Sequence, residues 1–209
     1  MPIFNTDKGI YMLNQTLTKS LLIFLLVIIV SVSIIYIVRT PVRLDVNDVT
    51  EINQKHPIIF LIRHGERCDR SQRICLSAHE GITVNGANKA QQYGDKFRRM
   101  FPYYSLYSTD TLRTMQTATF FSGGKTATIP DISTCDDNAV NNILKISKSD
   151  HVTVIFTHNH CLSRIAKKMN GWKFKPDYMG TLVLHRENHN LILDGHLKPN
   201  ELTQWSICW

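Results

Sequence analysis

The chain has 209 residues, and its 24 Lys and Arg against 17 Asp and Glu give a formal net charge of +7. A hydrophobic share of 43% with a charged share of 20% is ordinary for a chain that buries a core, and it argues against intrinsic disorder. Five cysteines are too few in this length for a small fold held together by disulfides alone. The length allows one ordinary domain together with a tail or an anchor.

One apolar segment dominates the N-terminal part of the chain. Residues 21–38 (LLIFLLVIIVSVSIIYIV) contain no charged side chain, and their number lies within the roughly 17–25 residues that cross a membrane as a helix. A cleaved signal peptide is the alternative, but its apolar region usually has about 7–15 residues and ends at a small-residue cleavage site. We therefore predict a tail over residues 1–20 and a transmembrane signal anchor over residues 21–38, with a signal peptide as the alternative.

The body that follows this segment is predicted to be exported. Two basic residues precede the segment and two follow it closely, so the positive-inside rule barely discriminates between the two orientations. A short N-terminal tail before a long C-terminal body favours export of the body. Residues 39–56 are polar and mixed, which predicts a stalk, and residues 57–209 are expected to form the domain.

The N-terminal part contributes +1 to the net charge, which leaves +6 for residues 39–209. The basic residues of this body are scattered, and no zinc-finger pattern, RNP-like pattern or long Lys/Arg tract accompanies them. A nucleic-acid partner is therefore not expected. An anionic substrate that carries phosphate is compatible with the positive charge, as is ordinary solubility.

Apolar runs alternate with helical patterns along this body. IIFLI at residues 58–62 and VTVIF at residues 152–156 are typical of strands buried on both faces of a sheet. From residue 85 to residue 101 apolar positions recur at spacings of three and four, which predicts a helix. Asp110 is predicted to cap the next helix. Further strands are expected at 106–107, 126–129, 181–185 and 190–194, and further helices at 110–121, 138–147 and 162–169. This order predicts an α/β fold in three layers, with helices on both faces of a mainly parallel sheet.

Polar side chains follow three of the predicted strands. Arg63 and His64 come directly after the first buried strand, His158 follows another, and Arg113 lies on the first turns of a helix after a third. Ligands of open α/β sheets bind at the carboxyl ends of the strands. A neutral imidazole is a good nucleophile toward phosphorus, and guanidinium groups bind phosphate oxygens in pairs. The sequence therefore predicts a pocket for a transferable phosphoryl group. Gly65 has no side chain, so it would allow the backbone to approach the anion closely.

The motifs in this pocket resemble those of a known family. LIRHGER, STDTLRTMQTA and FTHNH, in this order, resemble the histidine phosphatase superfamily. The longer strings RHGERCDRS, LYSTDTLRTMQTATFFSGGK, VIFTHNHCL and FKPDY resemble its lipopolysaccharide core heptose(II)-phosphate phosphatase group, over about residues 55–196. The resemblance implies a phosphoglycerate-mutase-like fold and an exported phosphomonoesterase that uses a phosphohistidine intermediate. It also implies a phosphorylated core sugar as substrate and no metal or other cofactor.

The resemblance further implies roles for individual residues and a location. His64 would be the phosphorylated nucleophile, and Arg63, Arg113 and His158 would hold the phosphoryl oxygens. Arg67 lies where a further arginine contacts phosphate in this superfamily. Residues 21–38 would place the protein in the periplasm, anchored to the inner membrane, or soluble there if the segment is cleaved.

The general acid is not identified by the motifs. The leaving alkoxide needs a proton, which a nearby carboxylic acid usually supplies. Asp136, Asp137 and Glu66 are the candidates. The resembling group leads us to expect a Glu near position 138, but this chain has Asn138 there. The alternative for the two aspartates is that one of them only caps the helix.

The cysteines fit an exported body. An oxidising compartment favours disulfides, and proximity to the strand ends favours the pairs Cys68–Cys75 and Cys135–Cys161 among the three pairings that four cysteines allow. Cys208 would then be left over. A zinc site is the rival interpretation, but no C-x₂-C pair is present among the cysteines, so no metal is expected.

Alternative functions from other classes stay open at this point. A phosphatase for protein phosphohistidine or for another sugar phosphate would use the same motifs, as would a mutase. Because the general acid is not identified, a catalytically weak protein of the envelope that binds phosphorylated glycans is a further alternative.

Overall fold

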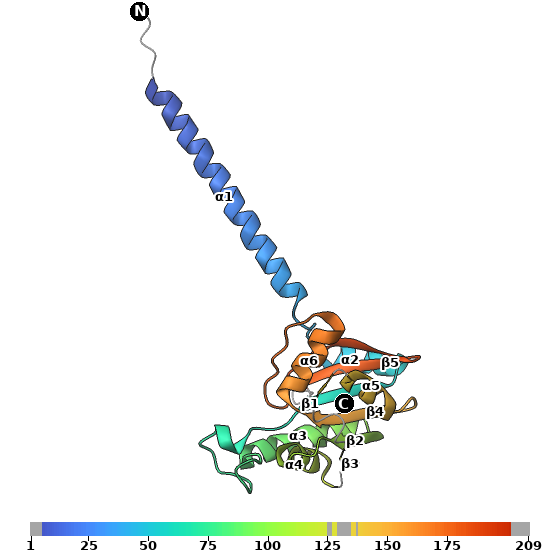
Figure 1. Cartoon of the computed structure of the whole chain (residues 1–209). Helices are drawn as coiled ribbons and strands as arrows, with labels where there is room; N and C mark the ends of the chain where they lie inside the picture. The colour runs from blue at the N-terminus through green and yellow to red at the C-terminus, as the bar shows by residue number, and fades with distance from the viewer. Residues whose placement is uncertain (1–5, 125–126, 129–134, 137, 202–209) are drawn as a thin grey trace, which may run out of the picture. The chain divides into compact units, whose positions relative to one another are not determined.

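The computed structural model describes residues 6–124, 127–128, 135–136 and 138–201 (Figure 1). The chain divides into two compact units, Met1–Thr40 and Pro41–Trp209, and each is described by itself.

The first unit consists of helix α1 (Thr6–Val38). Within it, Leu17–Tyr36 has a mean hydropathy of 2.6 and is long and apolar enough to cross a membrane. No side chain of this apolar stretch is buried. A signal sequence near the N-terminus has the same properties. The helix therefore includes the predicted apolar segment and extends back into the predicted tail.

The second unit is built on a six-stranded sheet with the strand order β3-β2-β4-β1-β5-β6. The first four strands in this order pair in parallel, and β5 and β6 add an antiparallel hairpin beside β1. The strands are β1 (Ile58–Arg63), β2 (Tyr104–Ser108), β3 (Ala127–Thr128), β4 (Val152–Thr157), β5 (Thr181–Glu187) and β6 (Asn190–Leu197). The predicted mainly parallel sheet is confirmed; residues 126 and 129 of one predicted strand lie outside the described residues.

Helices cover both faces of this sheet, as predicted. Side chains alternate along β1: Phe60 packs into one core with α2, α3 and α4, whereas Ile59 and Leu61 pack into a second core with α5 and α6. α3 and α4 lie side by side on the first face (Figure 1). The helices are α2 (Val46–Lys55), α3 (Val84–Met100), α4 (Leu112–Ser122), α5 (Ala139–Ile146) and α6 (Asn159–Asn170).

The segment predicted as a stalk belongs largely to the domain. Val46 and Val49 of α2 are buried in the first core, and the Leu44 N–H donates to the His196 carbonyl at 2.9 Å. Asp45 begins α2 with a capping box. The prediction of a stalk is therefore wrong for most of residues 39–56, because a short helix that buries few apolar side chains looks polar in the sequence.

Two predicted helix starts differ from the structure. The N-cap of α4 is Thr111, without a side-chain capping bond, so the prediction that Asp110 caps this helix is wrong. α4 ends, as predicted, where Gly123 adopts the left-handed conformation (φ 68°). α6 begins directly after His158 rather than at residue 162. Its N-terminal turn therefore lies beside the polar residues that follow β4.

Both favoured disulfides are present in the structure. Cys68 is bonded to Cys75 in the loop between β1 and α3, and Cys135 is bonded to Cys161 of α6. Cys208 lies outside the described residues. Two disulfides together with an apolar N-terminal helix indicate an extracytoplasmic protein.

Candidate active site

The carboxyl ends of β1, β4 and β2 lie side by side, since these strands are neighbours in the sheet. His64 follows β1, His158 follows β4 and Thr109 follows β2. The sheet hydrogen bonding continues past the strand ends: the His64 N–H donates to the Thr157 carbonyl at 3.0 Å, and the Thr109 N–H to the Phe156 carbonyl at 3.1 Å. The two histidine rings are thereby brought to one edge of the sheet, with centroids 5.6 Å apart.

His64 is buried and held in one tautomer. The residue is only 3% exposed, and its Nδ1 lies 2.8 Å from the Gly65 carbonyl oxygen. Because a carbonyl only accepts hydrogen bonds, Nδ1 carries the proton and Nε2 keeps its lone pair. Burial lowers the pKa of His64 to about 3, and the charges of Arg113 and Arg63 lower it as well. The hydrogen bond to Gly65 raises this pKa but does not outweigh burial. A neutral imidazole with a free Nε2 lone pair is suited to nucleophilic attack.

His158 is held through both ring nitrogens. Nδ1 lies 3.4 Å from Nη2 of Arg113, and Nε2 lies 3.2 Å from the Thr109 hydroxyl oxygen. Since a guanidinium only donates, the neutral ring carries its proton on Nε2 and donates it to Thr109. Thr109 in turn donates to the Thr114 hydroxyl at 3.0 Å. Burial, followed by the charge of Arg113, lowers the pKa of His158 to about 4.

Arg63 is clamped by the segment before β5. Its Nη1 donates to the Pro176 carbonyl at 2.7 Å, and its Cζ lies 4.0 Å from the centroid of the Tyr178 ring. This distance is typical of a cation–π contact. The same ring lies 5.9 Å from the His64 ring, centroid to centroid. Tyr178 therefore contacts both residues of the RH pair.

Two half-buried arginines in this site have buried donors without protein partners. The Nε atoms of Arg63 and Arg113 are buried and have no hydrogen-bond partner among the described residues. Burial lowers the pKa of both side chains, but an arginine stays protonated in proteins. Charged donors that lack protein partners favour an anion with several acceptor oxygens as the ligand.

Arg67, the further phosphate contact expected from the motif, has a protein partner in this structure. Its Nε donates to Oδ1 of Asp69 at 2.7 Å, and Nη2 contacts Oδ2, so the guanidinium fork is occupied by a carboxylate. The hydrogen bond to Asp69 raises the pKa of Arg67. Its charge still lowers the pKa of Arg63 and Arg113, so it remains within electrostatic range of the site.

Glu66 is fixed as a carboxylate, which makes it a poor general acid. It accepts hydrogen bonds from Asn85 and Thr83, both at 3.0 Å, and from Ser71 at 3.2 Å. Nη1 of Arg73 lies 3.6 Å away. Burial alone would raise the pKa of Glu66, but these donors and the arginine outweigh it and lower the pKa. Glu66 instead holds the loop between β1 and α3 together.

Gly65 packs closely against the start of α3. A Cβ at Gly65 would lie 3.2 Å from the Gly86 carbonyl oxygen, and a Cβ at Gly86 would lie 2.9 Å from the Glu66 nitrogen. The two glycines therefore let the loop after β1 pack against the first turn of α3. A side chain at position 65 would therefore crowd this contact; close approach of an anion to the backbone at Gly65 stays a prediction.

The predicted acid residues precede α5. Asp136 is exposed, and its Oδ1 accepts the Asn138 N–H at 2.8 Å. This bond helps to start the helix, in line with the capping alternative, although the N-cap itself is Asn138. Asp137 lies outside the described residues.

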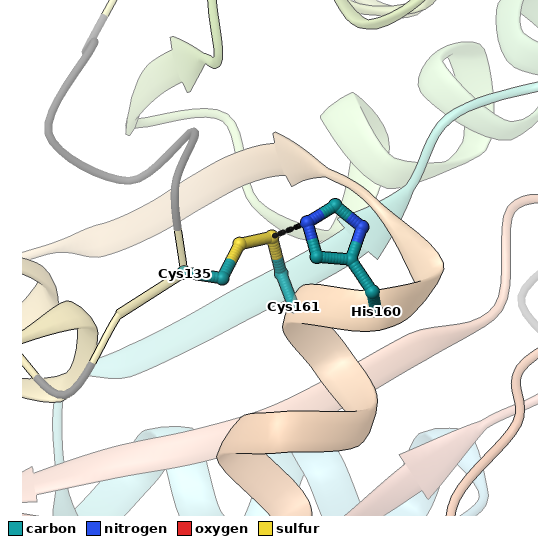
Figure 2. Close-up of side chains that lie close together, drawn as sticks. All are labelled: Cys135, His160 and Cys161. Atoms are coloured by element: carbon teal, nitrogen blue, oxygen red, sulfur yellow. Dashed lines mark hydrogen bonds between the residues drawn. A yellow bond between two sulfur atoms is a disulfide. The ribbon is translucent and has the colours of Figure 1, made fainter.

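A sulfur–imidazole cluster lies beside the site. His160 Nε2 is 3.7 Å from Sγ of Cys161, which is bonded to Cys135 (Figure 2). The His160 ring also stacks on His158, with centroids 5.4 Å apart. In the part of the chain that the structure describes, these three side chains form the one group with a spacing short enough to share a metal ion. In the disulfide the two sulfurs are not thiolates, which are the form that binds metals.

The sequence patterns did not identify three residues of this site as functional. Thr109 lies within the second motif, where an uncharged hydroxyl gives no signal of its own. Pro176 and Tyr178 lie within the FKPDY string, but both contact Arg63, which is far from them in the sequence. Pro176 is 113 residues away from Arg63. Only the packing of that segment against β1 shows the contact.

Comparisons with known proteins agree with this geometry. Residues 59–134 match the histidine phosphatase superfamily (branch 1). A lipopolysaccharide core heptose(II)-phosphate phosphatase from Salmonella newport (strain SL254) is 47% identical over 150 residues, which cover 70% of this chain and 74% of that protein. One from Salmonella arizonae is 44% identical over 161 residues, covering 75% and 80%.

A solved structure supports the fold assignment. The protein histidine phosphatase SixA, complexed with tungstate, aligns with a TM-score of 0.54 at 12% identity over 69% of this chain and 99% of that chain. At this identity the likeness concerns the fold alone. The curated relatives are similar enough over enough of their length to establish the family. The chain therefore belongs to the histidine phosphatase superfamily.

Proposed function

We propose that this chain is an exported phosphatase that removes the phosphate from heptose(II) of the lipopolysaccharide core. The reaction class is that of a histidine-phosphatase-type phosphomonoesterase. The substrate is proposed because two relatives at 44–47% identity carry this activity in their names. The observation that supports the chemistry best is His64, a neutral imidazole beside two half-buried arginines whose buried Nε donors have no partner among the described residues.

In the first step Nε2 of His64 attacks the phosphorus atom. The N–P bond forms while the bond from phosphorus to the sugar oxygen breaks, and the imidazole becomes a phosphohistidine. The Gly65 carbonyl holds the Nδ1 proton throughout, so it stabilises the positive charge that develops on the ring. Arg63 and Arg113 would bind the phosphoryl oxygens, whose charge rises in the transition state. A dianion between the two histidines would also raise the pKa of His158 and favour its donating form.

A carboxylic acid completes both half-reactions. We assign this role to Asp136 or Asp137, which would give a proton to the departing sugar oxygen. In the second step the resulting carboxylate would take a proton from water as the water oxygen attacks phosphorus. The N–P bond then breaks, inorganic phosphate leaves, and both the acid and His64 return to their starting forms. Arg67 would join the phosphate contacts by leaving Asp69.

The N-terminal helix supports a proposal for location. We infer that α1 anchors the chain in the inner membrane and that the domain lies in the periplasm, where its disulfides form. A cleaved signal sequence would leave the same domain soluble in that compartment. An anchored enzyme would meet a substrate that is itself attached to lipid.

The test uses the full chain in detergent, oxidised, with two substrates. One is a generic aryl phosphate and the other is isolated phosphorylated lipopolysaccharide core; wild type is compared with His64→Ala. We expect phosphate release from both substrates by wild type and from neither by the variant. In samples quenched with alkaline detergent the wild type should also carry acid-labile, base-stable phosphate, which is the property of phosphohistidine.

The outcomes separate the parts of the proposal. Release from the aryl ester alone would keep the chemistry and reject the heptose substrate. Release by His64→Ala at the wild-type rate would reject His64 as the nucleophile. If well-folded wild type hydrolyses neither substrate, the proposed activity is rejected, and binding of the phosphorylated core by the inactive protein would favour a binder of phosphorylated glycans.

A further inference from the structure

A second cleft opens between α5 and α6, beside the disulfide that follows the active site. It has a volume of about 630 Å³. Among the described residues its lining includes three cations of α6, namely Arg164, Lys167 and Lys168, and one carboxylate, that of Asp136. The described lining of the cleft therefore carries an excess of positive charge, unlike an ordinary gap between two amphipathic helices.

The three cations lie on one face of the helix. Positions three and four apart along an α-helix are neighbours on its surface, so Arg164 stands one turn before Lys167 and Lys168. All three residues are exposed at the surface of the domain. The exposed guanidinium and ammonium groups can therefore meet a ligand without the cost of stripping buried charges of water.

His160 links this cleft to the phosphoryl pocket. Its ring stacks on His158. Figure 2 shows its Nε2 in contact with the Cys161 sulfur. Burial lowers the pKa of His160, and the charges of Arg164 and Arg113 lower it further. Arg164 lines the cleft and Arg113 belongs to the phosphoryl pocket, so the ring is close enough to both sites to feel their charges. The two positive regions are therefore adjacent.

The spacing along α6 suits a ligand longer than one sugar phosphate. α6 starts beside His158 and rises about 1.5 Å per residue. Arg164 and Lys167 are therefore roughly 9 and 14 Å along the helix axis from His158. An anion held there belongs to a neighbouring sugar of the chain, not to the phosphoryl group at His64.

We propose that the cleft between α5 and α6 binds a second anionic group, a phosphate or a carboxylate, on the same oligosaccharide that presents its phosphate to His64. This inference rests on the proposed function, and it names a class of substrate: an oligosaccharide with several anionic groups rather than a single sugar phosphate. The Cys135–Cys161 disulfide supports the cleft, because it ties the chain before α5 to the first turn of α6.

The experiment compares substrates with one and with several anionic groups. The full chain is assayed with an aryl phosphate and with phosphorylated core oligosaccharide, as wild type, Arg164→Ala, Lys167→Ala and the double variant. Lys89→Ala is the matched control, since Lys89 is an exposed lysine of α3 on the opposite face of the sheet. Core oligosaccharide without the scissile phosphate is also tested as an inhibitor of aryl phosphate hydrolysis.

We expect the double variant to raise KM for the core on the order of tenfold, as the loss of hydrogen bonds to charged groups predicts. Its KM for the aryl phosphate should change far less, and its inhibition constant for the dephosphorylated core should rise in parallel with KM for the core. Lys89→Ala should resemble wild type in all three measurements. Lys167→Ala guards against indirect effects, because Arg164 also donates to the Cys135 carbonyl at 3.3 Å.

Each result bears on a different part of the proposal. Turnover of the core with equal constants for wild type and the double variant would overturn the second site and keep the proposed function. Inhibition by the core without turnover, relieved in the double variant, would overturn the proposed substrate and keep the site. If Lys89→Ala raised KM for the core as much as Lys167→Ala does, only the net charge of the protein would matter, and the cleft would be rejected as a binding site.

Discussion

His64 and His158 face each other edge-on across the carboxyl ends of two neighbouring strands, with ring centroids 5.6 Å apart and planes inclined by 66°. Both residues are buried, at 3% and 4% exposure. Burial disfavours protonation of either ring and the nearby arginines add to this effect, so the pKa is about 3 for His64 and about 4 for His158. The proposed nucleophile is thus neutral without needing a base to deprotonate it.

The first prediction concerns the titration of these two rings. In the free protein neither His64 nor His158 should titrate between pH 5 and pH 8, because their pKa values of about 3 and about 4 lie below this range. Heteronuclear NMR of the imidazole resonances, assigned with His64→Ala and His158→Ala, would measure this. A midpoint near pH 6.5 for either ring would contradict the prediction.

The same pKa values predict how stability depends on pH. In the unfolded chain a histidine takes up its proton near pH 6.5, whereas these two folded residues take theirs up only near pH 3 and pH 4. Between these values the unfolded state binds more protons, so the free energy of unfolding should fall as the pH is lowered from about 7 to about 4. Urea unfolding at several pH values would measure the slope, which should be shallower in His64→Ala.

Tyr178 is predicted to orient Arg63 through its ring and not through its hydroxyl. Tyr178→Phe keeps the ring beneath the guanidinium and should keep kcat/KM close to wild type. Tyr178→Ala removes a cation–π contact and should lower kcat/KM for an aryl phosphate roughly 2- to 30-fold. A large loss in the phenylalanine variant would instead point to a role for the hydroxyl in the reaction.

Glu66→Gln separates a structural role from an acid–base role. The substitution puts an amide where Asn85 and Thr83 donate, so it should cost about 1–3 kcal/mol of stability through unsatisfied or opposed hydrogen bonds. Denaturant unfolding would measure this cost. The shape of the pH–rate profile should remain that of wild type, and loss of its basic limb in the variant would identify Glu66 as the acid.

The general acid can be identified with leaving groups of different basicity. A nitrophenolate leaves without protonation, whereas a sugar alkoxide needs a proton. The variant that removes the acid, Asp136→Asn or Asp137→Asn, should therefore lose about 10²–10⁴-fold in the single-turnover rate of the first step, phosphorylation of His64, with the sugar phosphate and much less with nitrophenyl phosphate. Equal losses in this first step with both substrates in both variants would show that neither aspartate donates the proton to the leaving group.

The two disulfides should differ in their contribution to stability. The bond Cys135–Cys161 closes a longer loop than Cys68–Cys75, with sequence separations of 26 and 7. Loop-closure entropy then gives about 3.5 kcal/mol for the first and about 2.4 kcal/mol for the second. Chemical denaturation of the two paired Cys→Ala variants would test the order. The variant without Cys135–Cys161 should also lose activity, since it frees the chain that carries Asp136.

Much of the site could be predicted because its key residues follow directly after recognisable strands. The apolar runs at 58–62 and 152–156 predict buried strands, and the polar residues after them must lie at a sheet edge. His64 and His158 could be placed together on that basis. Arg67 was harder to predict, because its neighbour Asp69 occupies the fork that the motif assigns to phosphate. The motif looks the same whether or not Asp69, two residues away, binds the guanidinium of Arg67, so the motif does not reveal this contact.

The sequence by itself determined the apolar N-terminal helix, the alternation of strands and helices, and the residue types at the strand ends, because each depends on the local period of apolar side chains. Only the tertiary structure decided that α2 packs into the core, that Tyr178 stacks on Arg63, and that cations of α6 line a second cleft. These contacts join residues far apart in the chain. They depend on how helices and strands pack against one another, and a local sequence pattern does not predict this packing.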